Sequence, residues 1–203
     1  MISSRTVLFL GLSQLICWGV SYYLVGVFGG AIAADFGWSR DLVYGGFSLG
    51  LLATGLSSPF VGRLIDGHGG RSVMSIGSLV MAVGCLALAA SRNLASYYGA
   101  WIVIGVAMRL TLYDAAFAVL ARIGGPEAKR PISQITLLGG LASTILWPIG
   151  EGLAHWFGWR GAVVCYARLR AAHDSAPSGH SARALRREGE RRSAGRTSAP
   201  RGF

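Results

Sequence analysis

The stretch Gly62-Arg63-Leu64-Ile65-Asp66-Gly67-His68-Gly69-Gly70-Arg71 lies between two long apolar runs, at residues 42–61 and 73–90. Each run is close to the roughly 20 apolar residues that a helix needs to cross a bilayer. A short loop rich in glycine and charge between two such runs indicates a pair of membrane helices joined outside the lipid. This stretch therefore decides the fold class, which is that of an all-α membrane protein.

Three further apolar runs have spanning length, at residues 7–34, 97–121 and 132–157. We expect all five runs to be helices, because a lone strand in lipid would leave its backbone groups unpaired. Only 14% of the residues are charged, against about 25% in soluble domains. A cleaved signal peptide is the alternative for the first run, although its apolar stretch is far longer than the about 7–15 residues of a signal core.

A sixth apolar run begins at residues 161–166 and is then interrupted by Arg168 and Arg170. We expect a broken sixth span here, followed by a disordered tail over residues 167–203, whose Arg, Ala, Ser and Gly residues bury too little apolar surface to fold. The excess of arginine over lysine indicates a GC-rich gene, and we hypothesise that the tail is an out-of-frame translation. A genuine basic tail that binds anionic headgroups is the alternative.

The net charge of +10 is distributed as in a membrane protein. Its cations lie at the ends of the apolar runs and in the tail, so we expect the lipid bilayer, and no nucleic acid, as a partner. With a cytoplasmic N-terminus, six Lys and Arg residues fall in inside loops and three in outside loops. The positive-inside rule thus predicts that the N-terminus is cytoplasmic. We expect a multi-pass protein of the plasma (cell inner) membrane.

The loop at residues 62–71 resembles the motif G-x-x-x-D-[RK]-x-G-[RK]-[RK] of the major facilitator superfamily. In that family the loop is thought to latch two helical bundles together in one state of the transport cycle. A plain tight turn, with the acidic residue as cap of the next helix, is the alternative. We also expect the first glycine to let a neighbouring helix approach closely. The matching positions are Gly62, Leu64, Asp66, Gly69 and Arg71.

Residues 36–40 and 111–117 are similar to monocarboxylate porters and oxalate/formate antiporters of the same superfamily. The resemblance covers residues 6 to about 166, the N-terminal six-helix half of a fold that normally has two such halves. It implies secondary active transport of a small, anionic organic solute, by two bundles that rock around a central site. The C-terminal half, absent from this sequence, would be the natural intramolecular partner. The alternative is an inactive, truncated remnant or a membrane interaction fragment.

In that family the first and fourth spans line the central cavity. The first run carries Gln14, Trp18 and Tyr22 on one helical face, with Ser21 beside them. A stripe of polar and aromatic side chains in an apolar span is better suited to a substrate pathway than to lipid. Contacts between helices, or an aromatic belt at the membrane surface, are the alternatives.

The fourth run carries Arg109 and Asp114 inside apolar sequence, where a charge costs about 2.5–3.5 kcal/mol on insertion scales. The two residues are about 140° apart on a continuous helix, so we expect each to need a partner from another span, a water or a substrate. Arg109 would hold a carboxylate, and Tyr113 on the same face would add a hydroxyl. Asp114 would be either a proton-coupling carboxylate or a structural acceptor.

The sequence carries no P-loop, no GxSxG motif and no metal-ligand spacing of histidines or cysteines. We therefore expect a protein that is not an enzyme and that uses no cofactor or metal. The R-x-x-x-G pattern of many proton-coupled relatives lacks its arginine here, because Trp101 occupies that position before Gly105.

Overall fold

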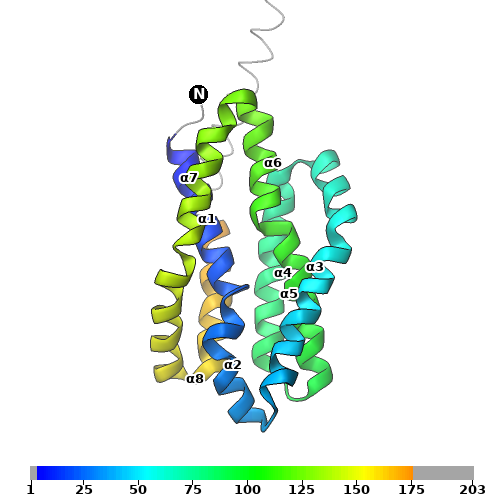
Figure 1. The fold of residues 1–203 in the computed structure, drawn as a ribbon, viewed down its shortest axis with the longest axis vertical. Helices are drawn as coiled ribbons and strands as arrows, with labels where there is room; N and C mark the ends of the chain where they lie inside the picture. Colours follow the sequence, from blue (N-terminus) through cyan, green and yellow to red (C-terminus); the bar gives the residue numbers. More distant parts are fainter. Residues whose placement is uncertain (1–3, 176–203) are drawn as a thin grey trace, which may run out of the picture.

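The computed structural model describes residues 4–175, except the side chains of residues 5, 71, 122, 123 and 173–175. Figure 1 shows a bundle whose helices run up and down along one long axis, with no strand in residues 4–175. The elements are α1 (Ser4–Val20), α2 (Leu24–Phe36), α3 (Arg40–His68), α4 (Gly70–Ala90), α5 (Leu94–Thr111), α6 (Tyr113–Gly124), the 3-10 turn η1 (Gly125–Ala128), α7 (Lys129–Gly140) and α8 (Ala142–Ser175).

Five helical segments in the described residues are long and apolar enough to cross a membrane. Together they contain all five predicted apolar runs, so the predicted all-α membrane fold is confirmed. The segments are Thr6–Phe36, Arg40–His68, Ser72–Ala90, Leu94–Ala121 and Gly125–Ala172.

Two of the predicted spans are interrupted helices. Between α1 and α2 the amide of Tyr23 donates to the carbonyl of Trp18 at 3.1 Å, a five-residue step that is typical of a π-type bulge. Between α5 and α6 the backbone of Leu112 is extended, with ψ of −170°. Neither break contains a proline or a glycine, so the sequence pattern predicted continuous helices at both places.

The sixth span is a correction to the sequence-based expectation. The backbone leaves the helical region at Gly158 (φ 67°, ψ 169°), and Figure 1 shows the second, orange part of α8 returning alongside the first. That part continues to Ser175, so the expected boundary between bundle and tail at residue 166 is wrong. Arginine is a good helix former, and the side chain of Arg170 is buried against other helices instead of ending the span. The rest of the predicted tail, residues 176–203, lies outside the described residues.

Helices α3 and α5 approach so closely that only glycine fits at their contact. A Cβ at Gly105 would overlap the carbonyl oxygen of Gly50. The hydroxyl of Thr54 lies 2.9 Å from the carbonyl oxygen of Gly50 and 2.8 Å from that of Gly105, so its one proton is shared between the two acceptors. Small residues that bring backbones together are a common means of helix association in membranes.

Replacing Gly105 with alanine is expected to destabilise the bundle by about 1–3 kcal/mol, because the added methyl group overpacks this contact. Gly99→Ala in the same helix is the matched control, since open space surrounds its would-be Cβ among the described residues. The thermal unfolding midpoint in detergent, followed by the helical circular dichroism, should fall for the first variant only. Equal midpoints would contradict the close approach of α3 and α5.

Candidate transport pathway

The breaks in the first and fourth spans lie next to each other. The side-chain amide of Gln14 donates to the carbonyl oxygen of Thr111, the last residue of α5, at 2.9 Å. In a continuous helix the amide of Ala115 would take that carbonyl, but here it donates to Leu112 instead. Gln14 thus satisfies a backbone acceptor that the break between α5 and α6 leaves without a helical partner.

Aromatic side chains from both broken spans form one continuous cluster beside the breaks. The ring of Trp18 lies 5.1 Å from that of Tyr22 and 5.2 Å from that of Tyr113, between ring centroids. Tyr113 stacks on Phe117 at 5.2 Å, and Tyr22 meets Phe47 of α3 edge-on at 5.3 Å. The structure therefore brings two of the predicted pathway residues, Tyr22 and Tyr113, into contact with a third, Trp18. We call these five residues the aromatic wall.

Arg109 and Asp114 form an ion pair, with Nη1 2.6 Å from Oδ2. This corrects the expectation that the two side chains cannot pair within their own span. The expected angle of about 140° assumed a continuous helix, whereas the extended backbone at Leu112 turns α6 relative to α5. The side chain of Arg109 is 24% exposed and that of Asp114 is 56% exposed. The pair is therefore accessible at its acidic end.

Several polar atoms around the wall have no hydrogen-bond partner within the described part of the chain. They are Oε1 of Gln14, Nε1 of Trp18 and Nε of Arg109, and all three atoms are buried. Buried polar groups are normally paired, so these three unpaired atoms are exceptions within the bundle. The hydroxyl of Tyr113 donates to the carbonyl of Thr136 on α7, at 3.2 Å, and ties the wall to that helix.

Ser21 does not lie on the same surface as the other predicted pathway residues. It is fully buried, and its hydroxyl donates to the carbonyl oxygen of Cys17 one turn earlier. Gln14 is also fully buried. In the structure Ser21 and Gln14 bind backbone carbonyl oxygens next to the two helix breaks, whereas Tyr22 is exposed.

The loop between α3 and α4 is short because Gly69 takes a positive φ of 79° and begins α4 directly. Leu64 packs beside the small cluster of Val61, Val73 and Leu110. No described atom would meet a Cβ at Gly62, so no helix of this bundle approaches it closely. The exposed Asp66 takes part in an interaction of its own. The predicted contact of Asp66 with the Arg71 side chain lies outside the described atoms.

Sequence reasoning missed Arg170, which is fully buried between α1 and α4. Its Nη1 donates to the hydroxyl of Ser13 at 3.3 Å, and its Nη2 donates to the hydroxyl of Ser78. The helical spacing of the buried residues Val163 and Tyr166, continued by one turn, would have placed Arg170 on the same face.

Arg160 joins three helices at the opposite end of the bundle from the loop at residues 62–71. It donates to the carbonyl oxygens of Ala89 and Ser91, both at 2.7 Å, and lies 3.1 Å from the carboxylate of Asp35. Its guanidinium also lies over the rings of Phe36 and Trp159, at 5.1 and 4.4 Å. The two aromatic clusters that follow the first and fifth runs are thus on one side, as their positions in the sequence predict.

Arg160→Gln is expected to destabilise the bundle by about 1–2 kcal/mol, because it removes charge-assisted bonds to the carbonyls that end α4. The matched control is Arg92→Gln, a neighbouring exposed arginine that should leave stability unchanged. Unfolding midpoints in detergent would measure both effects. Raising the salt concentration should reduce the difference in unfolding midpoint between the Arg160→Gln variant and the unmodified chain only slightly. The hydrogen bonds of Arg160 to the carbonyl oxygens are partly buried, so salt screens them little.

The described residues contain no group of three or more His, Cys, Asp or Glu side chains that could hold a metal ion. No curated protein matches the chain. The sequence profile of the Major Facilitator Superfamily matches residues 10–167, well over half of the 203 residues. Members of this family are membrane transporters. With its five spanning helical segments and this match, the chain belongs to the Major Facilitator Superfamily and is a multi-pass membrane protein of solute transport.

Proposed function

We propose that the chain supplies the N-terminal helical bundle of a secondary active transporter for a small organic anion, such as a carboxylate. The observation that carries the proposal is the ion pair of Arg109 and Asp114, set at the helix break that is followed by Tyr113 of the aromatic wall. A guanidinium in this position offers a carboxylate two parallel donors. Aromatic rings around it would hold the apolar part of the solute.

The helix breaks support a pathway at this place. Irregular backbone at membrane depth is tolerated where it is buried in protein or lines a water-filled cavity. Transporters commonly build their substrate sites from discontinuous helices. Here the breaks at residues 21–23 and at Leu112 come together through Gln14 and the contact of Trp18 with Tyr113.

The ion pair suggests how a solute would bind and leave. A carboxylate solute and the side chain of Asp114 compete for the same guanidinium. The exposed carboxylate can turn outward when the solute arrives, and the unpaired Nε of Arg109 offers it one more donor. A proton on Asp114 would also release Arg109, which would couple proton binding to solute binding.

We propose that the protein lies in the plasma membrane. In this topology the N-terminus and the loop at residues 62–71 are both on the cytoplasmic side. The loop then faces a second bundle, which it latches in one state of the transport cycle. The open surroundings of Gly62 support this arrangement, because they leave room for a helix from outside the described bundle. A membrane-impermeant thiol reagent should label Asp66→Cys only after the cells are permeabilised.

The function is tested with the purified chain in proteoliposomes and labelled lactate or oxalate as solute. Saturable uptake, or saturable binding to the chain in detergent, would support the proposal. Uptake equal to that of empty liposomes, together with no binding of either carboxylate, would instead indicate a remnant or a membrane interaction fragment.

A further inference from the structure

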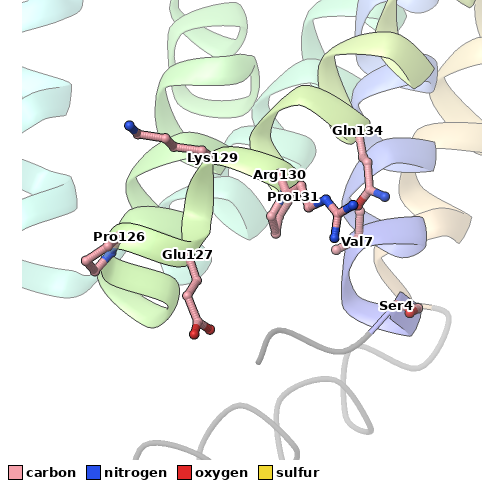
Figure 2. A pocket seen from close by; sticks show the side chains of 8 residues that line it. All are labelled: Ser4, Val7, Pro126, Glu127, Lys129, Arg130, Pro131 and Gln134. Carbon is pink, nitrogen blue, oxygen red and sulfur yellow. The ribbon is translucent and has the colours of Figure 1, made fainter.

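A pocket of about 560 Å³ lies at the end of the bundle where α1 begins, between α1, η1 and the start of α7. Figure 2 shows Arg130 and Gln134 of α7 on the side of this pocket nearest to α1, whereas Lys129 and Glu127 extend in other directions. The pocket lies apart from the aromatic wall, since the two share no lining residue. The transport pathway therefore leaves it without a role.

The wall of the pocket carries positive charge that the protein itself does not neutralise. Lys129 and Arg130 are both exposed, and neither forms an ion pair with a carboxylate in residues 4–175. Glu127, also on the wall, already takes part in another interaction. A concave surface that carries Arg130, with the charge of Lys129 nearby, favours an anionic ligand.

The backbone adds to this preference. Helices α1 and α7 both begin at the pocket, with Ser4 and Lys129 as their first residues. The first N–H groups of a helix have no partner within it and carry partial positive charge. At α7 the 3-10 turn η1 runs directly into the helix, since its N-cap Ala128 is itself helical (φ −69°, ψ −19°), so this preference applies chiefly to the start of α1. Phosphate groups are typical ligands of such helix starts when cationic side chains lie nearby.

The position of the pocket relative to the bilayer indicates whether lipid headgroups can reach it. The spanning segments that border it begin at Thr6 and Gly125. Val7 and Pro131 are buried on its inner side, while Ser4, Arg130 and Gln134 are exposed. An apolar inner side below a polar, cationic rim is the arrangement expected at the level of lipid headgroups.

We propose that this pocket binds a phosphate group at the bilayer surface, with Arg130 as its cationic donor, Gln134 as a neutral donor and Lys129 as a further positive charge nearby. An anionic lipid headgroup and a free phosphate ion carry the same chemistry. The inference does not depend on the solute that the chain transports.

The purified full chain in an uncharged maltoside detergent tests the proposal through the shift of its thermal unfolding midpoint. Three additives are compared, namely phosphatidylglycerol, phosphatidylcholine and inorganic phosphate. The double variant Lys129→Gln/Arg130→Gln is set against Arg63→Gln/Arg168→Gln, which removes the same charge from exposed arginines outside the pocket. Titration with each additive gives an apparent affinity for each protein.

Phosphatidylglycerol is expected to raise the midpoint of the unmodified chain and of the control variant, and phosphatidylcholine to have little effect. The pocket variant should need about tenfold more phosphatidylglycerol for the same shift. If inorganic phosphate competes with phosphatidylglycerol, the site binds free phosphate as well as the lipid headgroup. If inorganic phosphate has no effect, the site binds the lipid headgroup alone. Equal affinities of the pocket and control variants, or equal shifts from both lipids, would overturn the proposal. Unfolding midpoints without additive show that each variant is folded.

Discussion

Arg109→Gln is expected to weaken the binding of lactate or oxalate to the purified chain about 100-fold, because it removes the charged donors of a carboxylate site. Glutamine keeps much of the length of the side chain and one amide donor. The loss of affinity therefore measures the contribution of the positive charge and of the two parallel donors of the guanidinium. The ring of Trp18 lies 5.2 Å from that of Tyr113, the residue that precedes Asp114 in the sequence. The change in tryptophan fluorescence on adding the carboxylate is therefore a suitable signal for the titration. The Trp18→Phe variant, in which this change should disappear, shows that the signal comes from Trp18.

Asp114→Asn separates a binding role of Arg109 from a purely structural one. If the solute and Asp114 compete for the guanidinium, the variant should bind carboxylates several-fold more tightly than the unmodified chain. Arg40→Gln, which changes an exposed arginine at the start of α3, is the control and should leave the affinity unchanged. If Asp114→Asn weakened binding as much as Arg109→Gln, the ion pair would be a structural unit and the proposed site would be wrong.

The fold could be predicted from the sequence because its signal is the length of apolar runs, which depends on little else. Residues 42–61 and 73–90 flank the loop that decides the fold, and both lie within helices that could cross a membrane. Helix breaks are different, because Leu112 is an ordinary helix former with ordinary neighbours. Its extended backbone coincides with a hydrogen bond from Gln14 to Thr111, 97 residues apart, which no local pattern reports.

Three of the predicted pathway residues lie together in the structure, whereas the pairing of the two charged residues differs from the prediction. The sequence singled out Trp18, Tyr22 and Tyr113 as aromatic residues in apolar spans, and the structure brings them together. The pairing of Arg109 with Asp114 depends on the break at Leu112, so an argument from a regular helix could not find it. Arg170 was missed for a different reason. A cation in an apolar run indicates the end of a span, whereas in the structure the helix continues through Arg170 to Ser175.

Ser78→Ala is expected to destabilise the bundle by about 2–3 kcal/mol, more than the loss of Arg170 itself. The guanidinium of Arg170 is fully buried, and the hydroxyls of Ser13 and Ser78 are the acceptors that it has in the structure. Removing one acceptor leaves a buried charged donor without a partner. Arg170→Met removes the charge together with its need for acceptors and keeps the length of the side chain, so we expect a change of about 1 kcal/mol or less.

The two substitutions should be strongly coupled, which a double-mutant cycle measures. In the Arg170→Met background, Ser78→Ala is expected to cost only a few tenths of a kcal/mol, since a serine without a charged partner is easily replaced. Arg168→Met, two residues earlier and exposed, is the control for the loss of charge and should not change the unfolding midpoint in detergent. Additive effects of Ser78→Ala and Arg170→Met would contradict the hydrogen bond between them. A large loss from Arg170→Met alone would mean that the buried charge stabilises the bundle through a contact other than the two serines.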